Sequence, residues 1–374
     1  MNKGTIKLKY IYYDTIAGEV IDKSYWNKGD ELLYTCQKTP MKSDYSNFPE
    51  RKRTKKNDLL LTRNATPYIF VPQINSIYSN VVQKIAISNK FDKKFIKYAL
   101  DSGVEQLSVN GDTIPSWNMD VWNNMKIPIY DLNKQNAIAN YLDNKISRIN
   151  EIIDYNKKLV ELMEEYKQNR IIEKINNKTS SSKFIKLKYI CQMQRGSFNH
   201  RPRNDERYYN GEFPFIQTGD VANGSKYITT YSQTLNKLGY SVSRMFKKGT
   251  IAMTIAANIG DVSILTFDSC FPDSIIGFNS NNNDYLYYVL KSIKEKLEKN
   301  AIVSTQQNLN IDIVGNTVSN YEYNKVKQDE IVEYLNSICS SIDKSIKIKK
   351  QIMEKLEEYK KSLIYEAVTG KIEV

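Results

Sequence analysis

The feature that most constrains this chain is a long internal repeat. Residues 133–174 align with residues 326–367 without a gap, at a constant offset of 193. Within the repeat, the run EEYK at residues 164–167 recurs at residues 357–360. A repeat of this length predicts two similar modules related by an approximate two-fold axis. A chain built in this way is suited to a target that has two parts.

Each copy of the repeat predicts one long amphipathic helix. Residues 138–172 contain neither Pro nor Gly, and apolar residues recur at spacings of three and four. Asn156 and Lys349 fall in the same heptad slot of the two copies, and a polar residue at one core position fixes register and orientation. We therefore expect the two helices to pack on each other antiparallel. The predicted helix–helix seam comprises Leu142, Ile146, Ile149, Ile153, Asn156, Val160, Met163, Leu335, Cys339, Ile342, Ile346, Lys349, Met353 and Leu356.

The length of these helices suggests a spacer. Some 40 residues of helix span roughly 60 Å at about 1.5 Å per residue, which is close to two turns of duplex DNA at about 34–36 Å per turn. A single helix of this kind would favour an ordinary bundle core. Two gapless copies at the ends of two globular segments favour a spacer instead.

Length and charge narrow the class of protein. A chain of 374 residues is long enough for two or more domains with cores of their own. The formal charge of +12 favours a polyanionic partner such as nucleic acid or an anionic membrane surface. There is no apolar run of 18 residues and no N-terminal signal pattern, so we expect a cytoplasmic protein that is not bound to a membrane.

The sequence divides into five parts. We expect globular segments at 1–132 and 183–325, long helices at 133–175 and 326–374, and a linker at 176–182 with the polar sequence NNKTSSS. Both globular segments show short β-rich runs, and they share matched landmarks. Residues 6–11, 55–62 and 118–121 resemble residues 185–190, 247–254 and 308–311. Between these landmarks the two segments differ almost completely, so if each segment reads something, they read different things.

Two groups of cations are candidates for contact with DNA. Lys and Arg neutralise phosphates, Arg can read guanine with two hydrogen bonds, and Asn can read adenine. The alternative for any one of these residues is a solvated charged surface. The predicted DNA-binding residues are Arg51, Lys52, Arg53, Lys55, Lys56, Arg63, Arg195, Asn199, Arg201, Arg203 and Arg207.

The sequence lacks the motifs of several enzyme classes. The only histidine is His200, and nothing around it resembles a catalytic partner. No Walker A loop is present, and no two prolines are adjacent, which excludes the Asp/Asn-Pro-Pro-Tyr loop of an adenine methyltransferase. Pro272-Asp273 begins like a metal nuclease motif, but no Glu-x-Lys or Asp-x-Lys follows within 30 residues. We therefore expect a binding protein with no catalytic and no metal-ligating residues.

At this level of detail the chain resembles the specificity subunit of type I restriction–modification enzymes. The tract YYNGEFPFIQTGDV at 208–221 is similar to a family tract, as are residues 248–260. Residues 127–142 look like the family's Pro-containing strand followed by its Glu-Gln helix start, where this chain has Lys134-Gln135. The ending EAVTGKI at 366–372 is also typical of the family. Two departures are Thr317-Val318-Ser319 in place of the second Pro-x-Pro, and Asn57 where the second half has Gly249.

This resemblance implies an α+β fold, in which two mixed α/β target-recognition domains are separated by two long antiparallel coiled-coil helices. Each domain would read one half of a bipartite, asymmetric site in double-stranded DNA. The helices would dock two modification (methyltransferase) subunits, which bring S-adenosylmethionine and methylate adenine at N6. A restriction subunit that uses ATP and Mg²⁺ would join to cut DNA. The chain itself would hold no cofactor.

Two other hypotheses remain open at this stage. The first is a DNA-modifying enzyme that acts alone, which the missing motifs argue against. The second is a basic coiled-coil scaffold or adaptor without sequence preference, which the unequal interiors of the two segments argue against. Methylation by the purified chain would favour the enzyme, and equal binding to all duplexes would favour the scaffold.

Overall fold

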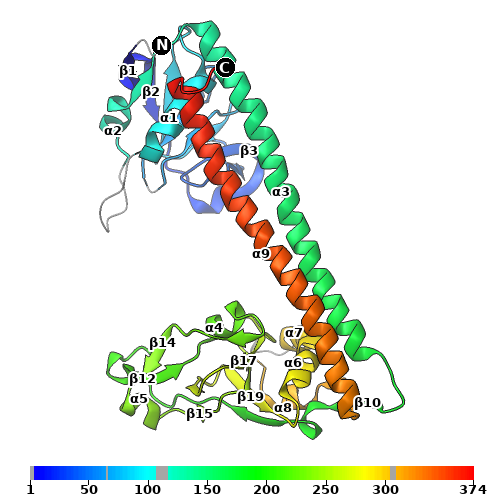
Figure 1. Cartoon of the computed structure of the whole chain (residues 1–374). Coiled ribbons are helices and arrows are strands. Elements are labelled where there is room, and N and C mark those ends of the chain that lie inside the picture. The colour runs from blue at the N-terminus through cyan, green and yellow to red at the C-terminus, as the bar shows by residue number, and fades with distance from the viewer. Residues whose placement is uncertain (1–3, 65, 107–116, 304–308) are drawn as a thin grey trace. The chain divides into compact units, whose positions relative to one another are not determined.

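A computed structural model describes residues 4–64, 66–106, 117–303 and 309–374 (Figure 1). The chain forms two compact units. The first unit comprises residues 1–157 and 349–374, and the second comprises residues 158–348. Each long helix therefore contributes one half to each unit.

Besides its segments of the long helices, the described part of the first unit contains two larger sheets, two α-helices and three short 3-10 helices. Its larger sheet has the strand order β2-β8-β5-β6, and its smaller sheet has the order β4-β3-β7. A separate two-stranded pair joins β1 to β9. The strands are β1 (Thr5–Lys7), β2 (Tyr12–Ala17), β3 (Trp26–Tyr34), β4 (Met41–Ser43), β5 (Asp58–Thr62), β6 (Ile69–Phe70), β7 (Ile77–Tyr78), β8 (Val82–Ile87) and β9 (Lys126–Pro128). The helices are η1 (Leu8–Tyr10), η2 (Lys23–Tyr25), η3 (Glu50–Lys52), α1 (Lys93–Gln106) and α2 (Met119–Asn124).

The second unit has the same kinds of element. Its larger sheet has the order β11-β19-β16-β17-β13, its smaller sheet has the order β14-β12-β18-β15, and β10 pairs with β20. The strands are β10 (Ser182–Lys186), β11 (Gln192–Arg195), β12 (Tyr209–Phe215), β13 (Tyr227–Ile228), β14 (Gln233–Leu235), β15 (Met245–Phe246), β16 (Ile251–Thr254), β17 (Val262–Leu265), β18 (Ser269–Cys270), β19 (Ile275–Asn279) and β20 (Val318–Glu322). The helices are η4 (Leu187–Tyr189), η5 (Glu206–Tyr208), α4 (Thr218–Asn223), α5 (Lys237–Ser241), α6 (Asn283–Ser292), α7 (Lys294–Val303) and α8 (Ile311–Asn316).

The two units repeat one topology. The order β2-β8-β5-β6 in the first unit corresponds to β11-β19-β16-β17 in the second, with antiparallel neighbours in both. In the smaller sheets, β3 runs parallel to β7 as β12 runs parallel to β18. The equivalent helices α2 and α8 have the same kind of N-cap. The side chains of Asn118 and Asn310 each accept from the backbone N–H group three residues on. The internal repeat predicted for the long helices thus extends through the whole chain.

The long helices are α3 (Leu132–Asn176) and α9 (Lys325–Thr369), each of 45 residues. Inside each unit they run in opposite directions, which confirms the predicted antiparallel pairing (Figure 1). In the first unit, Lys360 Nζ donates to Asn150 Oδ1 at 3.2 Å. In the second, Lys167 Nζ lies 2.7 Å from Asp343 Oδ1. These two contacts are equivalent under the offset of 193 residues between the copies of the repeat.

A buried glutamine joins each long helix to its globular part. Gln135 Oε1 accepts from the backbone N–H of Asp92, which precedes α1, and Gln328 Oε1 accepts from the side chain of Asn282, which caps α6. The Nε2 group of each glutamine donates to a backbone carbonyl nearby. These bonds give each buried amide both a donor and an acceptor partner, and they hold the start of each long helix against the N-terminus of α1 or α6.

Most of the predicted seam lies within the cores. In the first unit Leu142, Ile149, Ile153 and Asn156 are buried, whereas Ile146, Lys349, Met353 and Leu356 are half-buried. In the second unit Leu335 and Ile346 are buried, and Val160, Met163, Cys339 and Ile342 are half-buried. The amide of Asn156 donates to the Ile152 carbonyl of its own helix at 2.8 Å, so this contact satisfies the buried group within α3. Its role in fixing the register stays a prediction.

The heptad pattern missed apolar residues near the helix ends. Leu363 and Ala367 join the core of the first unit, and Ile171 and Ile175 join that of the second. These positions pack against the globular parts as well as the other helix, so a two-helix pattern does not find them. Across the described ranges, no helix is both long and apolar enough to cross a membrane.

Candidate nucleic-acid interface

A glycine ends the first strand of the larger sheet in each unit. Gly18 follows β2 and Gly196 follows β11. A Cβ atom added to Gly18 would lie 2.2 Å from the Tyr78 carbonyl oxygen, and one added to Gly196 would lie 2.2 Å from that of Pro272. Both positions require glycine because another backbone segment approaches too closely for a side chain. Each glycine therefore fixes the point at which the chain leaves the sheet.

A second fixed point lies where the smaller sheet begins. Asp22 and Asp205 cap short 3-10 helices by accepting from backbone N–H groups two residues on, at 2.8 and 3.2 Å. Five residues after each aspartate, Asn27 and Asn210 adopt left-handed φ values of 58° and 61°. The sequences DKSYWN and DERYYN share three of six residues. The sequence comparison missed this match between the units, so their interiors are more alike than we expected.

A cation anchors the first of these points in both units. Lys52 Nζ donates to the Ala17 carbonyl oxygen at 3.0 Å, and an Arg244 guanidinium N–H donates to that of Arg195 at 2.7 Å. Ala17 and Arg195 immediately precede the two glycines. Arg244 was not among the predicted residues, because it stands apart from the clusters of cations along the sequence. Its equivalence to Lys52 is visible only in the folded units.

The basic group of the first unit is partly used within the fold. Arg53 is buried, and its guanidinium contacts Glu50 at 2.9 Å, Glu31 at 3.0 Å and the Asn75 carbonyl at 3.0 Å. Because these contacts occupy the guanidinium, we withdraw Arg53 as a phosphate contact. Lys52 also pairs with Glu19 at 2.6 Å.

The other cations of this group are better placed for DNA. Arg51, Lys55 and Lys56 are exposed, and Arg63 is half-buried beside β5. The segment that carries Arg51, Lys55 and Lys56 precedes β5, as the segment with Arg244, Lys247 and Lys248 precedes β16. Contact of these residues with DNA stays a prediction.

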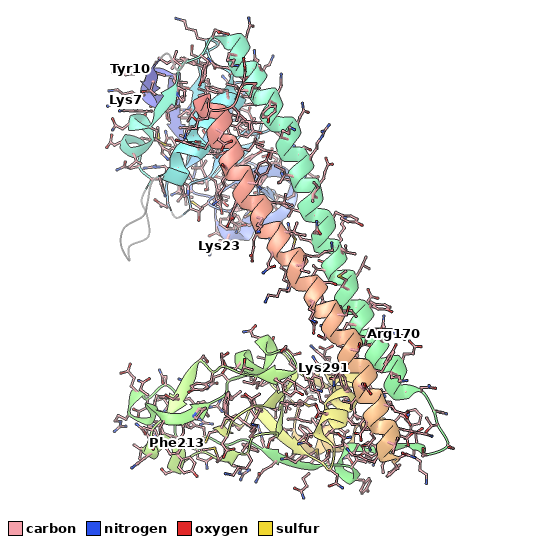
Figure 2. All side chains as sticks on the ribbon, viewed as in Figure 1. Lys7, Tyr10, Lys23, Arg170, Phe213 and Lys291 are labelled. Atoms are coloured by element: carbon pink, nitrogen blue, oxygen red, sulfur yellow. The ribbon has the colours of Figure 1, made fainter. Side chains whose placement is uncertain are left out.

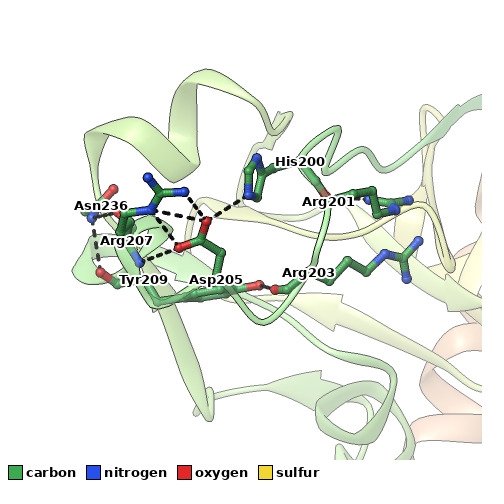
Figure 3. Close-up of polar contacts among 7 residues, drawn as sticks. All are labelled: His200, Arg201, Arg203, Asp205, Arg207, Tyr209 and Asn236. Atoms are coloured by element: carbon green, nitrogen blue, oxygen red, sulfur yellow. Dashed lines mark hydrogen bonds and ion pairs between the residues drawn. The ribbon is translucent and has the colours of Figure 1, made fainter.

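The basic loop of the second unit is an ordered network (Figure 3). The Asp205 carboxylate accepts from Arg207 at 2.6 Å and contacts His200 Nε2 at 3.0 Å. The hydrogen bond from Arg207 holds the pKa of Asp205 well below its usual range, and the same bond raises the pKa of Arg207. Asn236 donates to the carbonyls of Arg207 and Tyr209, at 2.9 and 3.2 Å. Arg207 is therefore bound to its own loop through one edge of its guanidinium.

Three of the predicted arginines gather around one acidic residue. Arg203 pairs with the Asp273 carboxylate, Arg201 lies 3.7 Å from it, and Arg195 Nε donates to the Asp273 carbonyl at 2.6 Å. Asn199 is exposed on the same loop. The cluster carries more positive than negative charge, which suits an anionic backbone. The structure thus brings Arg195, Arg201 and Arg203 together at Asp273, whereas Arg207 is bound to Asp205.

The arrangement contains little that could act in catalysis. His200 stacks on Tyr208 with ring centroids 3.9 Å apart, and its Nε2 faces Asp205. Among the described residues, no three His, Cys, Asp or Glu side chains are grouped closely enough to hold a metal ion. What the arrangement can do chemically is present cations and amides to a ligand.

Comparisons with known proteins point to one family. The model of the type I restriction modification DNA specificity domain matches residues 179–358. Two relatives come from Methanocaldococcus jannaschii. The MjaX type I restriction enzyme specificity subunit is 25% identical over 300 residues, covering 75% of this chain. The MjaVIII specificity subunit is 26% identical over 350 residues, covering 85% of this chain. The alignments span 65% and 80% of the lengths of these two relatives.

Solved structures share the fold. A chain from a study of complex assembly and conformational transition in a type I R-M system superposes with a TM-score of 0.75 at 14% identity, covering 99% of both chains. The HsdS subunit from Thermoanaerobacter tengcongensis gives a TM-score of 0.51 at 15% identity, covering 98% of this chain and 97% of that one. The domain match, the curated relatives and the repeated α+β architecture thus make this chain similar to the specificity subunits of type I restriction–modification enzymes.

Proposed function

We propose that this chain is the non-catalytic subunit that reads DNA for a type I restriction–modification complex. Each unit reads one half of a bipartite, asymmetric site in double-stranded DNA. The observation that carries this proposal is that both units fix the backbone at equivalent points, whereas the segments between these points differ. Gly18 and Asp22 bound a short segment in the first unit, whereas Gly196 and Asp205 bound a longer, arginine-bearing one in the second. Identical frames support equivalent placement on a duplex, and different loops support different base sequences.

The long helices act as the spacer in this proposal. The length of these helices would set the number of unread base pairs between the two half-sites. The equivalent contacts of Lys360 with Asn150 and of Lys167 with Asp343 support this role, because each joins α3 to α9 at a repeat-equivalent position.

The outer faces of the helices suit partner subunits. Tyr155, Tyr166, Ile348 and Tyr359 are between 53% and 66% exposed, and they occupy repeat-equivalent pairs of positions. Two similar apolar faces fit two copies of one partner. We propose that these partners are modification subunits, which carry S-adenosylmethionine and methylate adenine at N6. Restriction subunits that use ATP and Mg²⁺ would join the same complex.

Methylome sequencing tests the proposed function. The chain would be expressed with its modification subunit in a host that lacks a type I system. The expected result is one split motif with N6-methyladenine on both strands, which disappears when this chain is omitted. A soluble complex that yields no motif would refute the proposal, and equal binding to all duplexes would favour the scaffold. Methylation by the chain alone would show that it is an enzyme.

A further inference from the structure

We propose that residues 197–204 form a base-reading loop that is specific to the second unit, and that Asp273 positions its arginines. This inference rests on the proposed reading of DNA by each unit. In the first unit three residues lie between Gly18 and Asp22, but in the second eight lie between Gly196 and Asp205. Both ends of the segment are fixed by the same contacts in the two units. The second unit therefore carries an insertion of five residues at a defined place in a shared frame.

The base of the insertion is built into the fold. Phe198 is only 2% exposed and packs with Phe215, Leu235 and Cys270. The backbone N–H of Asn199 donates to the Val242 carbonyl at 3.0 Å, and the Ser243 hydroxyl donates to the Ser197 carbonyl at 2.8 Å. His200 contacts Asp205 (Figure 3) and stacks on Tyr208. These contacts give the loop a defined conformation before any ligand binds, which favours specific recognition.

The tip of the insertion presents groups that can read bases. Asn199, Arg201, Arg203 and Asn204 are all exposed. The side chains of Arg201 and Arg203 are 55% and 47% exposed, so each keeps free surface while it faces Asp273. Arginine recognises guanine through a planar pair of donors, and asparagine recognises adenine in a similar way. The loop thus combines a fixed base with side chains suited to the major groove.

A comparison of the two units shows that Asp273 occurs together with the insertion. Its counterpart in the first unit is Asn80, because β7–β8 and β18–β19 align at an offset of 193 and the turns between them have the same hydrogen bonds. The unit that lacks the arginines has a neutral residue at this position. The unit that has them places a carboxylate between them.

A carboxylate in this position has two consequences. It orients Arg203 directly and lies 3.7 Å from Arg201, whose Nη1 also donates to the Phe198 and His200 carbonyls at 2.7 Å. It also offsets part of the attraction of both arginines to phosphates, and phosphate contacts carry no sequence information. For comparison, the equivalent segment of the first unit offers only Lys23 as a cation between Gly18 and Trp26 (Figure 2). We infer that the two half-sites are read by different chemistry, with arginines of this segment acting in the second unit alone.

Four variants of the full chain, each in complex with its modification subunit, test this inference. Arg201→Lys and Arg203→Lys keep the charge but lose the planar pair of donors. Asp273→Asn removes the positioning carboxylate and reproduces the residue of the first unit. Asn80→Asp is the matched control, because it places a carboxylate where there is no arginine insertion. Each complex is assayed by methylome sequencing and by its affinity for the wild-type motif against duplexes with one changed base pair.

The expected result is a loss of discrimination of roughly tenfold or more at one base pair of one half-site in the arginine and Asp273 variants. The other half-site stays unchanged, and so does the affinity of the lysine variants for unrelated DNA. Asn80→Asp leaves recognition of this other half-site, which the first unit reads, as it is in the wild type. Unaltered discrimination in all three test variants, or an equal loss of affinity for every duplex, would overturn the inference. If the wild-type complex itself gives no split motif, the proposed function fails instead.

Discussion

The buried ion pair of Asp58 and Lys84 gives a quantitative test of how the first unit is built. Their side chains are 3% and 4% exposed, and Lys84 Nζ lies 3.6 Å from Asp58 Oδ2. Asp58 also accepts from the Lys55 backbone N–H at 2.7 Å, and Lys84 donates to the Arg53 carbonyl at 3.2 Å. The pair thus holds the backbone that carries the exposed Lys55 and Lys56. In the second unit the equivalent residues are Thr250 and Gly277, and the Phe246 ring packs on Gly277.

We predict that Lys84→Met costs about 3–4 kcal/mol of unfolding free energy at pH 7. The variant leaves Asp58 buried without its partner, so the carboxyl group must be protonated or stay charged in the core. Protonation at pH 7 of a group with an ordinary pKa near 3.9 costs about 4 kcal/mol, at about 1.4 kcal/mol per unit. Breaking a buried pair generally costs about 3–5 kcal/mol, which agrees. Removing both charges with Asp58→Asn and Lys84→Met should cost less than about 2 kcal/mol.

The pH dependence follows from the direction of the pKa shift. Burial already raises the pKa of Asp58 in the wild type, and loss of Lys84 raises it further. A carboxyl group whose pKa is raised by folding destabilises the folded state least below its unfolded pKa. The unfolding free energy falls as the pH rises from the unfolded pKa through the folded pKa. The deficit of Lys84→Met should therefore shrink as the pH falls from the folded pKa of Asp58 in the variant toward its unfolded value, by at most about 1.4 kcal/mol for each pH unit.

Urea unfolding of the full chain at several pH values measures these changes, and amide hydrogen exchange at Lys55 assigns them to the first unit. The matched control is Lys325→Met, because Lys325 and Asp329 form an exposed pair at 3.1 Å. That variant should cost under about 0.5 kcal/mol. A cost for Lys84→Met below about 1 kcal/mol at pH 7, or one that does not vary with pH, would refute the reasoning.

Three further predictions follow from the frame, the basic segment and the spacer. Gly18→Ala or Gly196→Ala should lower the unfolding free energy by about 2 kcal/mol or more, because the new Cβ would meet a backbone carbonyl at 2.2 Å; thermal unfolding with wild-type stability would contradict this. Replacing Lys55 and Lys56 together by Ala should weaken binding to every duplex and reduce the salt slope by up to about 2, as measured by titration between 50 and 200 mM salt. If the salt slope of binding is unchanged, DNA does not contact Lys55 and Lys56. Insertion of one helical turn after Lys157 should alter the spacer of the methylated motif and preserve both half-sites; altered half-sites with an unaltered spacer would disprove the role of the helices as a ruler.

The long helices were the most predictable part of this chain. Their periodicity depends on local spacing, and the gapless offset of 193 keeps both copies in register. The match of Asp22–Asn27 with Asp205–Asn210 was missed for a physical reason. The offset is 178 at the two glycines and 183 at the two aspartates, so the insertion between them disrupts the alignment. Structure restores the match because cap geometry and backbone approach do not depend on sequence length.

The candidate interface was predictable in composition but not in detail. Clusters of cations identified both basic segments, yet composition could not show that the guanidinium of Arg53 lies among Glu31, Glu50 and the Asn75 carbonyl. Arg244 was overlooked for the opposite reason, because its significance comes from one contact with the Arg195 carbonyl. The role of a charged side chain depends on partners that are distant in the sequence, and single-sequence patterns do not reveal those partners.

The fixed ends of the segment from Gly196 to Asp205 have a consequence for how such proteins diversify. The entropic cost of closing a flexible loop grows only with the logarithm of its length, so extending three residues to eight costs about 0.9 kcal/mol. Neither end has to move, because backbone contacts hold each one independently of what lies between. A lineage can therefore lengthen, shorten or exchange this stretch in single genetic events while the host protein still folds. Recognition of new sequences would then evolve far faster than the scaffold that presents it.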